Sequence, residues 1–220
     1  QQNLSLINND IIKALDKYQY PRILIGNLFY DHEQEEFYNQ PLLLDCEEKR
    51  KRLFDVAKNA KIMFEIGFNG GHSSFLCLSA NPNLKLIAND IAEFYKQCPK
   101  CHPEIYVPIA FETMKELFPN KITSIIGNCL TAVPKFVKNN PNLQVDFFHI
   151  DGTKETYMDD FFNLLPIFAD DAIVVFDDTQ QEGVQAIVDK LINDGYVKRI
   201  SQYPKMDSTI KYRHEIVQVL

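Results

Sequence analysis

Three aspartates stand at the ends of two apolar runs, where they would be able to share a ligand. Asp151 closes residues 145–151 (VDFFHID). Asp177 and Asp178 close residues 172–178 (AIVVFDD). If these runs are neighbouring parallel strands, their ends lie about 5 Å apart at the sheet edge where open α/β folds bind ligands. Because three carboxylates in one crevice repel one another, we expect them to hold a hard divalent ion, Mg²⁺ or else Mn²⁺ or Ca²⁺. The alternative is that they turn the chain or cap the next helix.

A glycine-containing turn at residues 65–73 (EIGFNGGHS) follows another apolar run and precedes a helical pattern. A strand that passes through such a turn into a helix presents bare backbone N–H groups to a ligand. Gly67 permits the tight turn, and Gly71 lets the helix approach closely. The spacing differs from the Gly-x-Gly-x-x-Gly of dinucleotide folds, and no Lys-Ser or Lys-Thr follows as in a phosphate-binding loop. A plain strand–helix connection with incidental glycines is the alternative.

Two acidic residues near this turn favour a nucleotide-like ligand that carries a positive charge. Glu65 lies in the turn itself, and Asp90 closes the next apolar run along the chain. An acid at this second position can accept hydrogen bonds from both hydroxyls of a ribose. The turn, Glu65 and Asp90 together therefore predict a cofactor with a sulfonium group and a ribose.

The elements that must position these residues alternate between strands and helices. The predicted strands are residues 61–66, 85–89, 122–126, 145–151, 172–177, 196–201 and 212–219. The predicted helices between them are residues 73–80, 110–118, 130–138, 157–168 and 181–193. The last two strands lie too close in sequence for a helical crossover, so we expect an antiparallel hairpin. The pattern predicts an α/β fold, a doubly wound Rossmann-like sheet of seven strands, mostly parallel, with helices on both faces.

Residues 1–60 are predicted to form a helical N-terminal extension to the core at residues 61–220, within a single domain of 220 residues. Residues 42–60 resemble an amphipathic helix. We expect residues 42–44, Leu53 and Val56 to face the core, and residues 47–52 to face water.

Composition excludes several classes of protein. Hydrophobic residues make up 45% of the chain, and the formal net charge of −7 disfavours nucleic acid as a partner. No apolar run approaches the ~18 residues that a membrane span requires. The five cysteines are an odd number and lie within apolar patterns, which predicts reduced thiols in a cytoplasmic protein. Cys98, Cys101 and His102 match a haem-attachment pattern, but without further ligands nearby we interpret them as part of a loop.

Five motifs in chain order give the sequence a family resemblance. They are Glu-Ile-Gly-x-x-x-Gly-x-Ser, Asn-Asp-Ile, Ile-Gly-Asn, Phe-His-Ile-Asp-Gly and Val-Phe-Asp-Asp. Together they resemble class I S-adenosylmethionine-dependent methyltransferases, and most closely the metal-dependent small-molecule O-methyltransferases, from about Leu42 to the C-terminus. The cofactor contacts that this resemblance and the turn imply are Gly67, Asn69 and Ser73 at the methionine end, Asp90 at the ribose, and Gly127, Asn128 and Cys129 around the adenine, with Glu65, Gly71 and Asp151 beside them.

The same resemblance bears on the metal. Catechol and caffeoyl-CoA O-methyltransferases place Asp, Asp and Asn at the positions of Asp151, Asp177 and Asp178. Some antibiotic-sugar O-methyltransferases place three Asp there, as this sequence does. A metal that holds the acceptor hydroxyl lowers the hydroxyl pKa and fixes its angle for in-line displacement at the methyl group.

Two residues are candidates for the general base. Lys154 has the offset from Asp151 at which the catechol and caffeoyl-CoA enzymes carry their proposed base, and a nearby metal and sulfonium would lower its pKa. The sugar enzymes instead carry an acid where this sequence has Thr153, so the metal pattern and the base point to different subgroups. His149 shares the face of Asp151 by strand alternation and would orient or deprotonate a substrate. The alternatives are a solvated surface lysine and a core histidine.

These observations predict an enzyme that transfers a methyl group from S-adenosylmethionine to a hydroxyl of a small molecule, such as a sugar, with the help of Mg²⁺. The alternatives are a metal-independent methyltransferase, a methyltransferase-like binding module without activity and, less favoured, a nicotinamide oxidoreductase. A homo-oligomer is compatible with the sequence.

Overall fold

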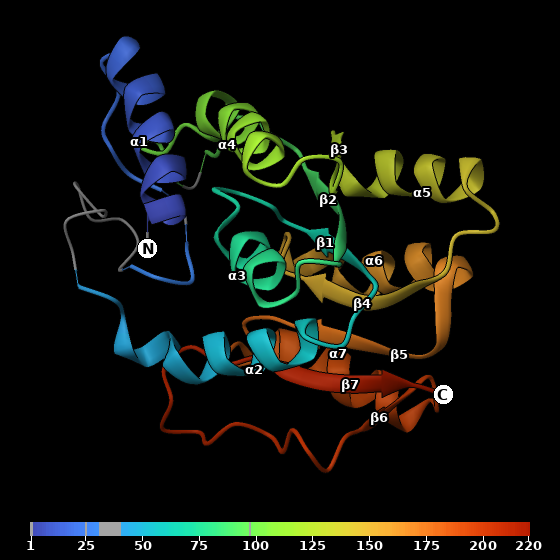
Figure 1. Cartoon of the computed structure of the whole chain (residues 1–220). Helices are drawn as coiled ribbons and strands as arrows, with labels where there is room; N and C mark the ends of the chain where they lie inside the picture. The colour runs from blue at the N-terminus through green and yellow to red at the C-terminus, as the bar shows by residue number, and fades with distance from the viewer. Residues whose placement is uncertain (1, 25, 31–40, 97) are drawn as a thin grey trace.

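A mixed β-sheet forms the centre of the computed structural model, which describes residues 2–24, 26–30, 41–96 and 98–220 (Figure 1). Within these residues seven strands pair in the order β3-β2-β1-β4-β5-β7-β6. They are β1 (Ile62–Ile66), β2 (Lys85–Asp90), β3 (Ile122–Ile126), β4 (Val145–Ile150), β5 (Phe168–Phe176), β6 (Val197–Arg199) and β7 (Glu215–Val219). Strands β1 to β5 pair in parallel, and β7 is antiparallel to both β5 and β6. The predicted sheet with an antiparallel C-terminal hairpin is confirmed.

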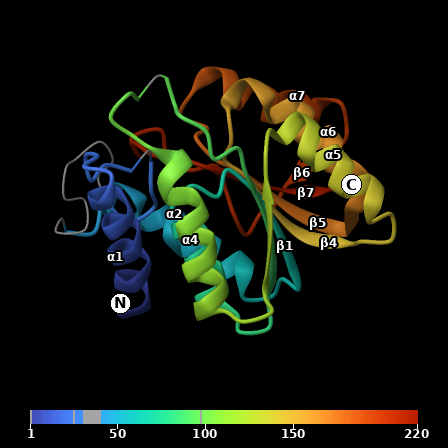
Figure 2. The ribbon, with the colours of Figure 1, turned by 90° about the horizontal axis from the view of Figure 1, so that it is seen from above.

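Helices cover both faces of this sheet, as a doubly wound α/β fold requires. They are α1 (Gln2–Lys17), α2 (Glu47–Ala57), α3 (His72–Ala80), α4 (Pro103–Leu117), α5 (Cys129–Asn139), α6 (Tyr157–Leu164) and α7 (Glu182–Asn193), with 3₁₀ turns η2 (Leu44–Cys46), η3 (Lys154–Thr156) and η4 (Leu165–Ile167). Figure 2 shows α1, α2 and α4 on one side of the sheet and α5, α6 and α7 on the other. Buried apolar residues form one cluster under α1 to α4 and another under α5 to α7. None of the described helices is both long and apolar enough to cross a membrane.

Two helix boundaries differ from the prediction, and both involve proline. Helix α4 begins at Pro103, ahead of the predicted start at residue 110, because the first position of a helix needs no backbone N–H. The helix predicted at residues 157–168 ends as α6 at Leu164, and Pro166 lies in the 3₁₀ turn that follows. Strand β5 consequently begins at Phe168 rather than at residue 172.

The face that α2 presents to the sheet differs from the predicted one. The side chains of Leu42 and Leu44 precede the helix and are 46% and 76% exposed. Lys49, which was expected to face water, is only 6% exposed. It lies one and two helical turns before Leu53 and Val56, both buried, so it belongs to the buried stripe by its spacing. Its charge, not its position, misled the prediction.

The N-terminal extension packs into the apolar cluster under α1 to α4, and it is hydrogen-bonded to the start of α3, next to the glycine turn. Residues 1, 25 and 31–40 of the extension lie outside the described part of the chain. Apolar residues of α1, including Ile7 and Ile11, are fully buried in the cluster that also contains Phe111 of α4. The ring of His72, at the start of α3, forms a 2.8 Å hydrogen bond from Nε2 to Oδ1 of Asn8 in α1. The extension is therefore integrated with the core through both apolar and polar contacts.

The cysteines do not all remain reduced. Cys98 and Cys101 form a disulfide across a Cα–Cα distance of 5.5 Å, which the prediction of five free thiols missed. A spacing of three residues in a loop allows the two Cα atoms to approach within the range that a disulfide spans. Cys46, Cys77 and Cys129 are free. The prediction of reduced thiols is therefore wrong for Cys98 and Cys101 and is confirmed for the other three cysteines.

We predict that the stability of the protein falls with decreasing pH in the range where His72 takes up a proton. Burial lowers the pKa of His72 from 6.5 to about 4. The unfolded chain therefore binds a proton on this ring before the folded chain does, and stability is lost as the pH falls from 6.5 to about 4. In His72→Gln the pH dependence of the free energy of unfolding over this range should be smaller, by up to about 3 kcal/mol. Urea denaturation at several pH values measures it, and equal slopes in the two proteins would contradict the prediction.

Candidate active site

The glycine turn between β1 and α3 lies directly against the chain that follows β4. Gly67 has φ of 89°, and a Cβ at this position would overlap the backbone carbonyl of Asp151. Gly71 has φ of 75°, and its Cβ would lie 2.7 Å from the ring of Phe68. Both glycines are thus required by backbone conformation and by close approach. The turn and the end of β4 form one edge of the sheet.

Glu65 is fully buried beneath the turn rather than open to solvent. Its carboxylate accepts hydrogen bonds from the hydroxyls of Ser73 and Ser74 and from Nδ1 of His149, the last at 2.8 Å. Strand pairing places Glu65 directly opposite His149. Glu65 therefore fixes α3 and β4 relative to the turn, and Ser73 is bound to it.

Asp90, at the end of β2, contacts the turn itself. Its Oδ2 accepts a 2.7 Å hydrogen bond from the backbone N–H of Asn69, and its Oδ1 accepts a 2.8 Å hydrogen bond from Ala92. Burial raises the pKa of Asp90, although these two backbone hydrogen bonds lower it. Asp90, the residue predicted to bind the ribose, therefore lies next to the glycine turn predicted to bind the cofactor.

The predicted adenine contacts lie beside Asp90, at the ends of β2 and β3. The backbone N–H of Gly127 donates to the carbonyl of Asp90 at 2.9 Å. Asn128 caps α5 through a 2.9 Å hydrogen bond from the backbone N–H of Leu130 to its Oδ1. Cys129 begins the helix. The structure thus brings these residues to the same edge as the glycine turn.

The N-terminal segment and α4 hold the side chain of Asn69. Its Nδ2 donates to the carbonyl of Gly26 at 2.7 Å, and its Oδ1 accepts from the hydroxyl of Tyr106 at 2.7 Å. Sequence reasoning missed Tyr106 because nothing in the spacing of α4 indicates a contact with the turn.

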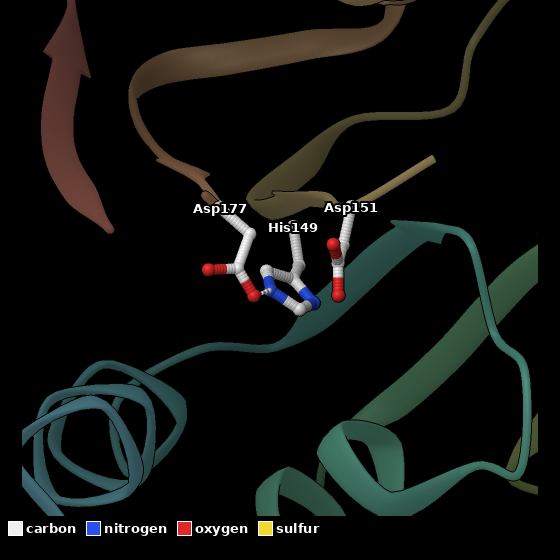
Figure 3. A group of neighbouring side chains, drawn as sticks. All are labelled: His149, Asp151 and Asp177. Atoms are coloured by element: carbon white, nitrogen blue, oxygen red, sulfur yellow. Dashed lines mark ion pairs between the residues drawn. The ribbon is translucent and has the colours of Figure 1, made fainter. Parts of the chain in front are cut away.

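The predicted acidic crevice forms where β4 and β5 pair, but its membership changes. His149, Asp151 and Asp177 each offer a ligand atom, and these atoms lie within 4.8 Å of one another. Figure 3 shows the three side chains pointing to the same side of the sheet. Asp178 is not part of this group, since its carboxylate binds Lys154 and Gln180 instead. Its backbone has φ of 56°, in the left-handed region.

Lysine side chains already pair with the carboxylates predicted to bind a metal. Nζ of Lys49 lies 2.5 Å from Oδ1 of Asp177. Nζ of Lys154 lies 2.9 Å from Oδ1 of Asp151 and 2.8 Å from Oδ2 of Asp178. Two carboxylates and an imidazole are a suitable donor set for Mg²⁺ or Mn²⁺ by chemistry alone. In this arrangement they do not fit a divalent ion, because it would have to displace two ammonium groups.

The charged neighbours also change the candidates for the general base. Burial alone would lower the pKa of Lys154, but Asp151, Tyr157 and Asp178 outweigh it and raise that pKa. Burial likewise opposes protonation of His149, yet the carboxylate of Asp177, 3.7 Å from its Nε2, and its hydrogen bond to Glu65 raise its pKa to about 10. The neighbouring carboxylates therefore favour the protonated form of both side chains. The lowering of the Lys154 pKa by a bound metal and sulfonium stays a prediction.

Asp151 is the acid of the crevice that is suited to proton transfer near neutral pH. Its side chain is 32% exposed, compared with 5% for Asp177. Burial, opposed by the ammonium of Lys154 and reinforced by the charges of Asp177 and Asp178, raises the pKa of Asp151 to about 7. Such a value lets one carboxyl group accept a proton at a useful rate.

Comparison with known proteins identifies the family. Residues 64–179, more than half of the chain, match the model of a family described as a methyltransferase domain. The chain belongs to this methyltransferase family. The predicted class of protein is confirmed. No curated protein matches the chain.

Solved structures share the fold of this methyltransferase domain. One is the O-methyltransferase from Bacillus cereus in complex with SAH, with a TM-score of 0.65, 12% identity and coverage of 97% of this chain and 90% of that chain. Another is the O-methyltransferase TomG from Streptomyces achromogenes in complex with SAM, with a TM-score of 0.62, 16% identity and coverage of 100% and 90%. At such low identity the likeness establishes the fold alone.

We predict that Gly67→Ala lowers the free energy of unfolding by about 2–4 kcal/mol, because the new methyl group meets the backbone of Asp151 at a positive φ. Gly183→Ala in α7 is the matched control. Nothing lies within 4 Å of a Cβ there, and alanine should stabilise the helix by up to about 1 kcal/mol. Urea denaturation of both variants measures the difference, and a Gly67→Ala variant as stable as the wild type would be inconsistent with this packing.

Proposed function

We propose that this chain transfers the methyl group of S-adenosylmethionine to a hydroxyl group of a small molecule. The observation that carries the proposal is the contact between Asp90 and Asn69, which joins a ribose-binding acid to a glycine turn of methyltransferase spacing. The acidic crevice lies at the same sheet edge, since Gly67 packs against the backbone of Asp151. A cofactor bound at the glycine turn and an acceptor bound in the acidic crevice would therefore lie next to each other.

Two structural relatives support the proposed cofactor and the proposed type of acceptor. The Bacillus cereus and Streptomyces achromogenes proteins are named O-methyltransferases and were solved with SAH and SAM. Their fold extends over almost the entire present chain. The net charge of −7 favours a small-molecule acceptor over a nucleic acid. We further propose that the chain forms a single domain and acts in the cytoplasm. A homo-oligomer stays a prediction.

S-adenosylmethionine, when bound, supplies a methyl group on a positively charged sulfur that leaves as a neutral thioether. The chain's own residues must orient the acceptor hydroxyl and take its proton. Asp151 lies at the boundary between turn and crevice and is accessible to an acceptor. Lys154 bonds to Asp151 and to the hydroxyl of Tyr157, which holds the carboxylate in place. We propose Asp151 as the base in place of Lys154 and His149.

A reaction assisted by Mg²⁺ is the second candidate. The specific observation in its favour is the group of ligand atoms from His149, Asp151 and Asp177. The ion pairs of Lys49 and Lys154 with the same carboxylates count against it. The proposed methyl transfer from S-adenosylmethionine is the same in both cases, whether Asp151 or Mg²⁺ assists the loss of the acceptor proton.

Calorimetry tests the cofactor. We expect the wild type to bind S-adenosylmethionine and not NAD⁺, and Asp90→Ala to bind it at least about tenfold more weakly, since a charged hydrogen-bond acceptor is lost. Asp207→Ala is the matched control, because Asp207 also accepts a 2.8 Å hydrogen bond from the N–H two residues later but lies in an exposed loop. A wild type that does not bind S-adenosylmethionine at millimolar concentration would refute the proposed function.

Transfer of labelled methyl groups to a panel of small hydroxylated molecules tests the base. We expect Asp151→Asn to lower kcat by about 100-fold or more while cofactor affinity changes little. Asp159→Asn, on the exposed side of α6, should retain the wild-type rate. If Asp151→Asn retains that rate and Lys154→Met loses it with normal cofactor binding, the base is Lys154.

A further inference from the structure

A buried lysine from the N-terminal extension occupies the acidic crevice. Lys49 is 6% exposed and lies on the stripe of α2 that faces the sheet. Its ammonium is 2.5 Å from Asp177, whose side chain is 5% exposed. Burying an ammonium is costly unless a partner compensates it. The pair therefore has a defined electrostatic role instead of being a chance surface contact.

Asp177 links Lys49 to the rest of the crevice. Its other carboxylate oxygen lies 3.7 Å from Nε2 of His149, and Nδ1 of His149 binds Glu65 at 2.8 Å. Burial favours the neutral form of Asp177, but Lys49 and His149 outweigh it and hold its pKa well below the usual range. Asp177 is consequently an anion with a cation on each side.

The charges of the crevice nearly balance without any added ion. Its cationic side chains in the described part of the chain are Lys49, His149 and Lys154, and the acidic side chains that pair with them are Glu65, Asp151, Asp177 and, outside the group of ligand atoms, Asp178. A divalent ion between Asp151 and Asp177 would add two positive charges beside two ammonium groups. Repulsion at such short distances in a poorly solvated site opposes binding of the ion. The carboxylates are therefore already compensated by the protein.

We propose that Lys49 takes the place of a divalent cation in this site, as a built-in counter-ion that holds Asp177 and keeps the crevice free of bound metal. Lys49 is a positioning residue, since it acts through Asp177. The proposal goes beyond the proposed function by assigning the charge compensation of the site to the N-terminal extension. Metal binding can be measured without methyl transfer, so this part of the proposal is tested independently of the proposed function.

Calorimetric titration with Mn²⁺ and Mg²⁺ tests the proposal directly. We expect the wild type to bind neither ion at millimolar concentration and Lys49→Ala to gain a Mn²⁺ site. In Lys49→Ala/Asp177→Asn the gain should be lost, because the uncompensated carboxylate is gone. Lys190→Ala is the matched control, since it breaks an exposed 2.7 Å pair with Asp194 and should create no site. Saturable binding of Mn²⁺ by the wild type, abolished by Asp177→Asn, would overturn the proposal.

The variants must be folded for this comparison, which circular dichroism and urea denaturation establish. Loss of one partner of a buried ion pair is strongly destabilising, so Lys49→Ala is titrated at a temperature below the midpoint of its thermal unfolding. If it does not fold, the wild-type titration still decides, as does Lys49→Arg, which keeps the charge and should remain free of Mn²⁺. A folded Lys49→Ala that gains no Mn²⁺ site would also count against the proposal.

An activity arm rests on the proposed function. Wild-type methyl transfer should continue unchanged after treatment with EDTA, and loss of activity restored by Mg²⁺ would overturn the proposal. Absence of turnover with every acceptor, together with an intact Mn²⁺ result, would instead place the failure in the proposed function and leave the counter-ion role standing.

Discussion

A row of alternating charges crosses the buried face of the sheet, and the rest of the site depends on it. Glu65 of β1 faces His149 of β4, and His149 approaches Asp177 at the end of β5. Lys49 of α2 completes the row. In the interior each charge is tolerated only because the next one compensates it, so removal of any member exposes its neighbours to the full cost of burial. The row thereby fixes the position of the glycine turn relative to the crevice.

Close backbone approach adds to this electrostatic coupling. Because Gly67 has no side chain, the turn after β1 rests on the carbonyl of Asp151 after β4. Asp90 and Gly127 extend the same edge across β2 and β3. A ligand that spans the edge would therefore meet a surface whose parts are connected by hydrogen bonds. Parallel strands make this possible, since their carboxyl ends lie together.

Local patterns in the sequence predicted much of this, because strand alternation and turn spacing are local properties. The positions of Asp90, Asp151 and Asp177 at strand ends follow from apolar runs that end in an acid, and the structure brings them to one edge. The pairing of Lys49 with Asp177 was missed because a charged residue was assigned to the solvent face, although its spacing from Leu53 and Val56 places it on the buried face. The pairing of Asp178 with Lys154 and Gln180 depends on contacts with the chain beyond the two strands, which spacing alone does not reveal.

The burial of Lys49 has a consequence for what counts as a module in this chain. The segment that carries the family signature, residues 64–179, begins after Lys49 and contains Asp177. Excised at those borders, it would keep every motif by which such proteins are recognised and yet leave Asp177 without its ammonium partner. The segment that identifies the family is thus shorter than the segment that contains all the charged partners of the site. Sequence changes in the N-terminal extension would alter the chemistry of the site, although the extension contains none of the family's motifs.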